Sequence, residues 1–398
     1  MSAALPLALD PYLRDWLDLL LRVLHVIAAI AWIGTSFYFV LLDQSLRPVE
    51  KAEDAADGVA GELWEVHGGG FYRVQKYRVA PPRLPDHLAW FKWEAYATWL
   101  SGFGLLIVLY YLEASATLID PRVADLEPWQ AAASSIALLA AAWVAYDVLC
   151  RLLARSDWAL GVAVLALTAV AAWASSELFA PRAAWLQVGA MLGTIMAANV
   201  FFVIIPAHRE LIRAKEAGRE PDPAAGIRGK QRSVHNNYLT LPVLLTMLAG
   251  HFAFLVTRDR AWLILVALMV LAASVRLFYN LRHGGRTIWA IPVAAAVAVV
   301  ALAVALDEDE PSSGAPDPAL AARGATVFAS AGCGGCHTLA AADASGNVGP
   351  SLDALRPSAS RVQGVVTAGK GAMPSFGAEL TGDEIAAVAA YVSSVADR

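Results

Sequence analysis

The stretch AAWLQVGAMLGTIMAANVFFVIIP, residues 183–206, contains no charged side chain. A helix of about 20 apolar residues is long enough to cross the hydrocarbon core of a membrane. Of the chain's 398 residues, 58% are hydrophobic and only 16% are charged, which excludes an ordinary soluble protein with its roughly 25% of charged residues. Apolar runs of this length occur eight times, centred on residues 17–42, 94–113, 129–150, 158–179, 183–206, 236–257, 261–280 and 287–306. We therefore predict an all-α chain built on an eight-helix transmembrane bundle.

The distribution of Lys and Arg predicts how this bundle is oriented. The connections on one side hold 18 basic residues, and those on the other side hold six. Cytoplasmic connections carry the excess of Lys and Arg in membrane proteins. Because the predicted number of helices is even, both termini are expected on the periplasmic side, together with everything that follows residue 306.

The chain after residue 306 differs in composition from the rest. Residues 307–398 hold 11 acidic and five basic side chains, a net charge of −6, whereas the whole chain carries −5. Acidic residues with Pro, Ser and Gly at 307–317 are typical of a solvated linker. We predict three parts, which are a transmembrane domain over 1–306, a linker over 307–317 and a small periplasmic domain over 318–398. Helical spacing at 318–331 and 383–395 predicts that this small domain is also all-α.

The motif CGGCH at residues 333–337 predicts a covalently bound haem. In this motif the thiols of Cys333 and Cys336 attach to the haem, and His337 binds the iron from one side. A zinc site would need a second pair of Cys or His ligands nearby, and a thioredoxin-like site would need a βαβ pattern; the segment has neither. We expect one haem c, and its large apolar surface would supply the core that a domain of roughly 80 residues lacks.

Met373 is the candidate for the second axial ligand of the haem iron. It is the only methionine after residue 306, in the stretch Gly-Ala-Met-Pro-Ser-Phe. A Met thioether is a common sixth ligand in c-type cytochromes and raises the reduction potential. The alternative interpretation is that Met373 fills the core of the domain. Haem c is attached in the periplasm, which agrees with the orientation predicted from Lys and Arg.

Several stretches resemble known families. Gly324, Phe328, the pair Gly349-Pro350 and Tyr391 make residues 318–397 similar to class I cytochrome c domains. The membrane part is similar to bacterial membrane-bound, cytochrome c-containing urate oxidases, also called urate hydroxylases. This second resemblance is carried by two stretches, GELWEVHGGGFY at 61–72 and SVHNNYLTLP at 233–242.

The resemblance implies a function. Members of this family oxidise urate toward 5-hydroxyisourate, and the electrons leave through the cytochrome without forming peroxide. The implied setting is the inner membrane of a bacterium, with several helices in the lipid. The implied acceptor is a soluble cytochrome c or a terminal oxidase. No nucleic-acid partner is expected.

Polar side chains within the apolar runs are candidates for the urate site, because such residues are costly in a membrane. Those predicted in the cytoplasmic half are Asp147, Asn199, Asn236, Asn237, Arg276 and Asn280. Urate is a flat monoanion with N–H and carbonyl groups, so a guanidinium and amides suit it. We predict that Arg276, Asn236 and Asn237 bind it. The alternative is that Arg276 pairs with Asp147 or extends to the membrane surface.

The connection at 43–93 is too rich in aromatic residues for a disordered linker. Glu65, His67 and the glycines at 68–70 are predicted to form a lid over the ligand, with His67 as the proton acceptor. A different interpretation applies to Trp90 and Trp93, which are equally typical of anchors at the lipid headgroups.

A second haem, of type b, is a further hypothesis. His25 and His251 are predicted at comparable depths inside two helices, as the two ligands of a membrane-embedded haem would be. Such a centre would bridge a cytoplasmic urate site and the periplasmic haem c. The alternative is that both histidines are structural.

Three function classes remain open from the sequence. The first is an enzyme, a urate:cytochrome oxidoreductase. The second is an electron-relay subunit of a respiratory complex, in which the helices only dock a partner and haem c does all the redox work. The third is a redox-linked transporter, although no inverted repeat pairs broken helices in the two halves. Eight helices with buried Arg, Asp, Asn and His favour the enzyme, because an anchor needs only one helix.

Overall fold

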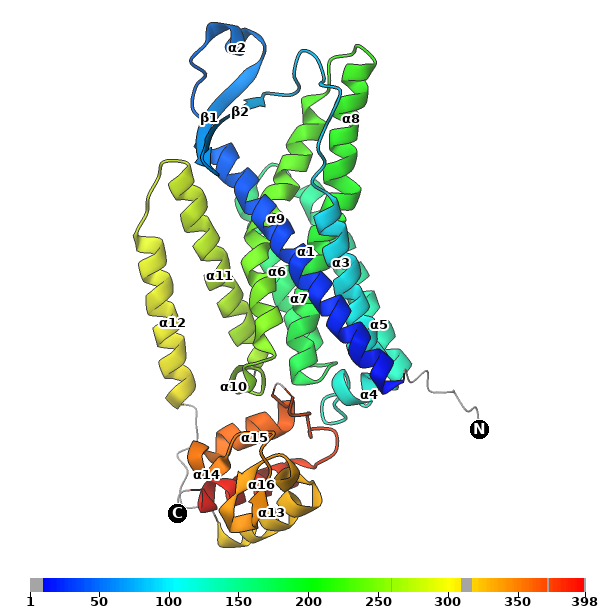
Figure 1. The fold of residues 1–398 in the computed structure, drawn as a ribbon, viewed down its shortest axis with the longest axis vertical. Coiled ribbons are helices and arrows are strands. Elements are labelled where there is room, and N and C mark those ends of the chain that lie inside the picture. Colours follow the sequence, from blue (N-terminus) through cyan, green and yellow to red (C-terminus); the bar gives the residue numbers. More distant parts are fainter. Residues whose placement is uncertain (1–9, 259, 309–316, 371, 397–398) are drawn as a thin grey trace.

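The computed structural model describes residues 10–258, 260–308, 317–370 and 372–396 and is mostly helical. Long helices form a bundle, and a small helical unit made by the end of the chain lies against one end of it (Figure 1). The bundle helices are α1 (Pro11–Ser45), α3 (Trp93–Leu106), α5 (Pro128–Leu152), α6 (Asp157–Ser176), α7 (Pro181–Ala198), α8 (Ile205–Glu216), α9 (Pro223–Ala249), α11 (Ala261–His283) and α12 (Ala290–Glu308).

Each of the eight predicted apolar runs contains helix, but the runs differ in how well they suit a membrane. Within the described part of the chain, five helices are long and apolar enough to cross one: α1, α5, α6, the joined α7 and α8, and α11. The apolar part of α12, Ala290–Leu306, is shorter. Helix α3 has 14 residues before the π-helical turn Ile107–Tyr111, and α9 begins with a charged segment. Eight crossings therefore remain an expectation.

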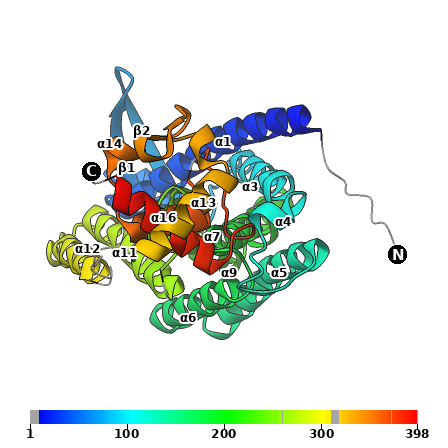
Figure 2. The same cartoon turned by 90° about the horizontal axis from the view of Figure 1, so that it is seen from below.

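The centre of the bundle is α7. Trp185, Val188, Met191, Leu192 and Ile195 are buried on it, and α5, α6 and α9 pack around it (Figure 2). The chain continues from α7 through a second π-helical turn, Asn199–Ile204, into α8. Helices α1 and α12 lie at the periphery and expose many apolar side chains, as expected of surfaces that face lipid.

The connection between α1 and α3 contains a β-hairpin, so the expectation of an all-α chain is wrong there. Strand β1 (Val59–His67) pairs antiparallel with β2 (Gly70–Tyr77), after the short helix α2 (Ala52–Ala56). Gly68 and Gly69 have φ values of 58° and 81°, and this left-handed pair makes the tight turn that joins two antiparallel strands. The hairpin lies at the end of the bundle away from the C-terminal unit and projects beyond the helices (Figures 1 and 2).

The C-terminal unit is built on two crossing helices, α13 (Pro318–Ser330) and α16 (Gly382–Val395). They approach closely at Gly324, where any Cβ would collide with the backbone carbonyl of Ala387. Between them lies a small core that includes Phe328 and Tyr391. The remaining elements are α14 (Leu352–Leu355), α15 (Ala359–Ala368) and a two-residue strand pair, β3 (Thr338–Leu339) with β4 (Ala344–Ser345).

Two short helices of the bundle, α4 (Ala114–Thr117) and α10 (Ala253–Val256), lie at the end that faces the C-terminal unit (Figure 1). Helix α10 packs against α15. Most of the predicted linker, residues 309–316, lies outside the described residues.

Candidate functional site

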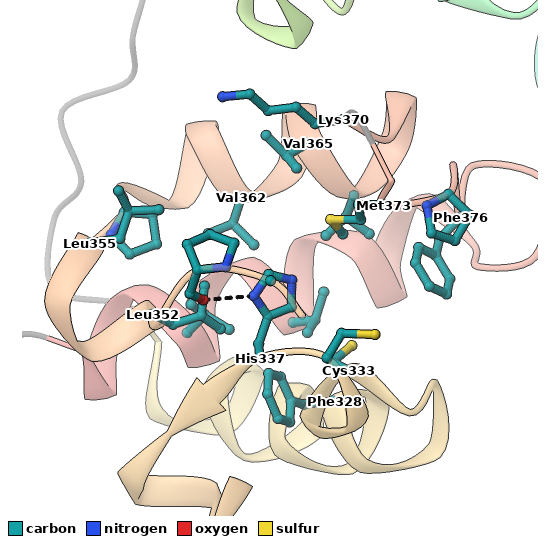
Figure 3. A pocket seen from close by; sticks show the side chains of 18 of the residues that line it. Phe328, Cys333, His337, Leu352, Leu355, Val362, Val365, Lys370, Met373 and Phe376 are labelled. Carbon is teal, nitrogen blue, oxygen red and sulfur yellow. Dashed lines mark hydrogen bonds between the residues drawn. The ribbon is translucent and has the colours of Figure 1, made fainter. Parts of the chain in front are cut away.

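The predicted haem residues surround one cavity in the C-terminal unit. Cys333, Cys336, His337 and Met373 line it, and its volume is about 320 Å³. His337 and Met373 face each other across this space, with Cys333 at its edge (Figure 3). The remaining wall is mostly apolar and includes Phe328, Leu352, Val362, Val366, Val388 and Val392.

The orientation of His337 is set by its neighbours. Its Nδ1–H donates to the carbonyl of Pro350 at 2.9 Å, which leaves Nε2 to face the cavity (Figure 3). A metal-bound histidine commonly has its other ring nitrogen fixed in this way. A Cβ at Gly349 would lie 2.5 Å from Cε1 of the ring, so only glycine fits beside it.

These residues fit a haem c. The two free thiols stand beside an apolar space, with an imidazole on one side and a thioether on the other. This is the donor set of a c-type cytochrome with His and Met ligands. His337 and Met373 would therefore hold the iron, and Cys333 and Cys336 the porphyrin.

The bundle holds a buried polar network on one face of α9. We name it the Tyr146 network, after the residue at its centre. Arg232 donates to Oδ1 of Asp147 at 2.6 Å and to Oδ1 of Asn199 at 3.3 Å, and its guanidinium lies over the Tyr146 ring at 4.9 Å. Asp147 also pairs with the exposed Arg151. The members of this network are Tyr146, Asp147, Asn199, Arg232, His235 and Asn236.

Hydrogen bonds link the members of the Tyr146 network to one another. The Tyr146 hydroxyl accepts from Nδ2 of Asn199 at 3.0 Å and lies 2.7 Å from Nδ1 of His235, where the His235 tautomer decides which atom donates. The amide of Asn236 is occupied at both ends, by Asn199 and by the carbonyl of Met196. The charge on Arg232 is balanced, and its polar neighbours are satisfied.

A second group of residues, which we name the Arg276 cluster, joins α9 to α11 and to Phe37 of α1. It consists of Phe37, Asn237, Arg276 and Asn280. Arg276 donates from Nε to Asn237 at 3.3 Å and from a terminal nitrogen to Asn280 at 3.2 Å, and its guanidinium lies 3.8 Å from the centre of the Phe37 ring. Its exposed fraction is 6%, yet no carboxylate among the described residues forms an ion pair with it.

The Arg276 cluster also has unused donors. A guanidinium has five N–H groups, and two of those on Arg276 have an acceptor among the described residues. The Asn237 side chain is fully buried; its Oδ1 accepts from both Arg276 and Asn280, but its Nδ2 has no partner in the described part of the chain. The cluster is thus a buried cation beside an unpaired amide donor, which is an arrangement that suits an anion.

The structure brings some predicted site residues together and separates others. Asn237, Arg276 and Asn280 form one cluster, whereas Asp147, Asn199 and Asn236 belong to the Tyr146 network on another face of α9. The alternative pairing of Arg276 with Asp147 is absent from the described structure, because Asp147 pairs with Arg232 and Arg151. Sequence reasoning missed Tyr146, Arg232 and His235, although His235 stands next to Asn236 and Asn237 in the quoted stretch at 233–242.

The hairpin residues are not members of the Arg276 cluster. His67 is exposed at the turn, and Glu65 accepts a hydrogen bond from the Tyr38 hydroxyl at 2.6 Å. Tyr38 follows Phe37 on α1, so the hairpin is tied to the helix one residue away from the ring that covers Arg276. Trp93 is 68% exposed, while Trp90 packs against buried Ala95, Val200 and Ile205.

The two histidines considered for a haem b are not placed as a pair of ligands. Nδ1 of His25 lies 2.9 Å from the carbonyl of Thr98, and the His25 ring packs against Gly102 of α3. Helix α9 ends at Ala249, so His251 lies beyond it and is exposed, not inside a membrane helix. The prediction of equal depth is therefore wrong, and the structure does not support a haem b.

Comparison with known proteins gives two family matches. Residues 11–307 match the family described as urate oxidase N-terminal, and residues 319–392 match the family described as cytochrome c oxidase, cbb3-type, subunit III. Among solved structures, the chain is similar to the c-type cytochrome SorU from Sinorhizobium meliloti, at 48% sequence identity over 20% of this chain and 94% of that chain, with a TM-score of 0.20. The comparison with curated proteins gave no match.

Proposed function

We propose, from the premise that this chain belongs to the urate oxidase N-terminal family, that it is a membrane-bound enzyme which oxidises urate toward 5-hydroxyisourate. Its electrons would pass to the haem c of its own C-terminal unit and on to the respiratory chain, without peroxide. The accepting partner would be a soluble cytochrome c or a terminal oxidase.

The observation that carries this proposal is the uncompensated charge of Arg276. Burying an ion without a partner costs several kcal/mol, whereas the charge on Arg232 is balanced by Asp147. A bound urate monoanion would balance Arg276, and the unpaired Nδ2 of Asn237 would donate to a urate carbonyl. The Arg276 guanidinium already contacts an aromatic face at the Phe37 ring, and urate is a flat group of the kind on which a guanidinium stacks.

We assign a role in the proposed reaction to each of the site residues. Urate takes up the oxygen of one water and releases two protons and two electrons. Arg276, Asn237 and Asn280 bind and orient the anion, and Asn236 holds α9 against the backbone of α7. His67 accepts a proton when the hairpin closes, with Glu65 tying the hairpin to α1 through Tyr38. His337 and Met373 would hold the haem c, which would supply a one-electron acceptor.

The proposed placement in the membrane is argued from the three parts of the chain and from the position of Arg276 on α11. The transmembrane domain comprises residues 1–306, the linker 307–317 and the cytochrome domain 318–398. Arg276 is 15 residues from the start of α11, which puts it about 22 Å along the helix from the end near the C-terminal unit. The urate site would then open toward the cytoplasm, with both termini and the haem in the periplasm of a bacterial inner membrane.

The proposal is tested by anaerobic spectroscopy of the full chain in detergent. Urate is added to the fully oxidised protein, and the reduced α-band of haem c is followed. Prompt reduction is expected. If the haem stays oxidised with urate but is reduced by dithionite, the enzyme assignment fails and the relay subunit becomes the function to pursue.

A matched pair of variants tests the site itself. R276Q removes the buried charge, and R282Q removes an exposed charge from the last turn of the same helix. A hydrogen bond to a charged group contributes about 1.5–3 kcal/mol, so R276Q should weaken urate binding about 10- to 150-fold with its haem content intact. R282Q should behave like the wild type. Equal urate-driven reduction in R276Q and the wild type would show that the site is elsewhere.

A further inference from the structure

A large cavity separates the bundle from the C-terminal unit. Its volume is about 1370 Å³, and it is distinct from the haem cavity, although Arg361, Val365 and Lys370 border both. The bundle side is formed by the segment between α9 and α11 and by α11 and α12. The other side is formed mainly by α15, which faces the bundle (Figure 1).

The lining of this cavity is rich in basic side chains. Five basic side chains line it, which are Arg122, Arg258, Arg260, Arg361 and Lys370, and no carboxylate stands among its described lining residues. Arg122 is paired with Asp120 at 2.9 Å. In contrast, Arg260, Arg361 and Lys370 form no ion pair with any carboxylate that the structure describes.

Basic residues are scarce on this side of the molecule, which makes their convergence informative. The sequence predicts six Lys and Arg residues on this side of the bundle, and three of them line the cavity. The acidic segment 307–398 has five, and two of those line it. Arg260 on the bundle side and Arg361 and Lys370 on the other side repel one another unless an anion lies between them.

The lining of the cavity also has an apolar part. It is lined by Phe252, Phe254, Leu263, Ile264, Ala303 and Leu306. Leu263 and Ile264 lie on α11, and Ala303 and Leu306 lie on α12, at the ends of two helices whose apolar surfaces run on into the bundle. A small flat anion would balance the charge of the basic side chains but would leave this apolar wall uncovered.

We propose that the cavity binds an anionic phospholipid. Its phosphate would lie among Arg258, Arg260, Arg361 and Lys370, and its acyl chains would cover the apolar wall of α11 and α12. Basic pockets beside membrane helices are known to bind such headgroups. The lipid joins the two basic walls and so holds the C-terminal unit against the bundle. The inference rests on the membrane placement proposed above and is independent of the urate chemistry.

The test uses variants on the bundle side, because Arg361 and Lys370 also border the haem cavity. R258Q/R260Q is compared with R14Q/R22Q, which removes two charges from the same end outside the cavity. Phospholipid bound to each purified, haem-containing protein is counted by native mass spectrometry. After delipidation, short-chain phosphatidylglycerol, phosphatidylcholine of the same chain length and inorganic phosphate are titrated separately.

The wild type and R14Q/R22Q should retain an anionic phospholipid and rebind phosphatidylglycerol but not phosphatidylcholine. Each Lys or Arg near an anionic surface contributes about 1 kcal/mol, so R258Q/R260Q should bind it about 30-fold more weakly. Equal binding by both double variants would overturn the proposal. Binding of inorganic phosphate as tight as that of the lipid would show a simple anion site instead. Fractionation of the wild type away from membranes would refute the membrane placement, separately from the lipid site.

Discussion

Asn237 and Asn236 are neighbours in sequence, yet their side chains have opposite hydrogen-bonding states. The amide of Asn236 is occupied at both ends, whereas Nδ2 of Asn237 has no partner among the described residues. The two positions therefore separate a residue that holds the fold from one that is available to a ligand. Exchanging each amide for a carboxylate tests this difference.

In N237D a carboxylate would replace the amide that contacts Arg276, and it would supply the missing negative charge from within the protein. We expect urate-driven haem reduction to be lost while the thermal unfolding temperature stays equal or rises. In N236D the donor to the Met196 carbonyl is lost, and an unsatisfied buried group costs about 1–3 kcal/mol. N236D should therefore unfold at a lower temperature. If N237D keeps its urate response, Arg276 does not bind the substrate.

Gly349 is a second position where a single residue decides a site. A Cβ there would be 2.5 Å from the His337 ring, whereas a Cβ at Gly335, two residues before His337, would meet nothing within 4 Å. We expect G349A to displace His337 from its bond to Pro350 and to lower the covalent haem content or shift the reduction potential. G335A should match the wild type in both. Normal haem content and potential in G349A would show that the ring has room to move.

At the scale of elements, the contact between α7 and α9 positions both polar groups of the bundle, because α9 carries residues of each. Thr246 of α9 packs onto Gly189 of α7, and a Cβ at Gly189 would overlap the Thr246 side chain. Gly193, one turn later on α7, has open space beside it. The close approach of these helices therefore depends on one glycine and not on the other.

G189A should reduce stability by about 1–3 kcal/mol through overpacking, and G193A should be neutral or slightly stabilising, because alanine favours helix. Thermal unfolding in detergent measures both. T246A combined with G189A should recover most of the loss, since it removes the atoms that the new Cβ meets. Stability of G189A equal to that of G193A would contradict the observed packing of α7 on α9.

At the scale of the whole molecule, net charge is distributed unevenly between the bundle and the C-terminal part of the chain. The bundle is close to neutral, and residues 307–398 carry a net charge of −6. Within this C-terminal segment, the basic residues Arg361 and Lys370 line the cavity between the C-terminal unit and the bundle. The negative charge is thus left for the surface that meets an electron acceptor, and a basic partner would be attracted to it.

Salt should therefore slow the oxidation of the reduced protein by a basic soluble cytochrome c, with the rate constant falling steeply between about 10 mM and 150 mM ionic strength. Under the proposed function, reduction of the haem by urate is internal to the chain and should change little over the same range. Stopped-flow measurements of the two half-reactions separate them. An acceptor reaction that does not depend on salt would mean that the acidic surface plays no part in docking.

The sequence by itself determined the features that depend on neighbouring residues. The motif at 333–337, the position of Met373 and the apolar runs are local, so their spacing alone predicts a haem site and membrane-crossing helices. The resemblance to cytochrome c-containing urate oxidases is confirmed by the family matches. The hairpin was missed because its strands have only nine and eight residues. Alternation of apolar and polar side chains over so short a stretch, interrupted by aromatic and charged residues, is a weak signal within a long connection.

Only the tertiary structure decided which buried charges are paired. Arg232 and Arg276 look alike in sequence, but the rotation of α9 relative to α5 and α11 gives Asp147 to the first and leaves the second without a carboxylate. Likewise, five basic residues from segments distant in sequence line the one cavity between the bundle and the C-terminal unit. Such pairings depend on how helices pack around their axes, and packing is decided by the fit of many side chains that no single segment contains.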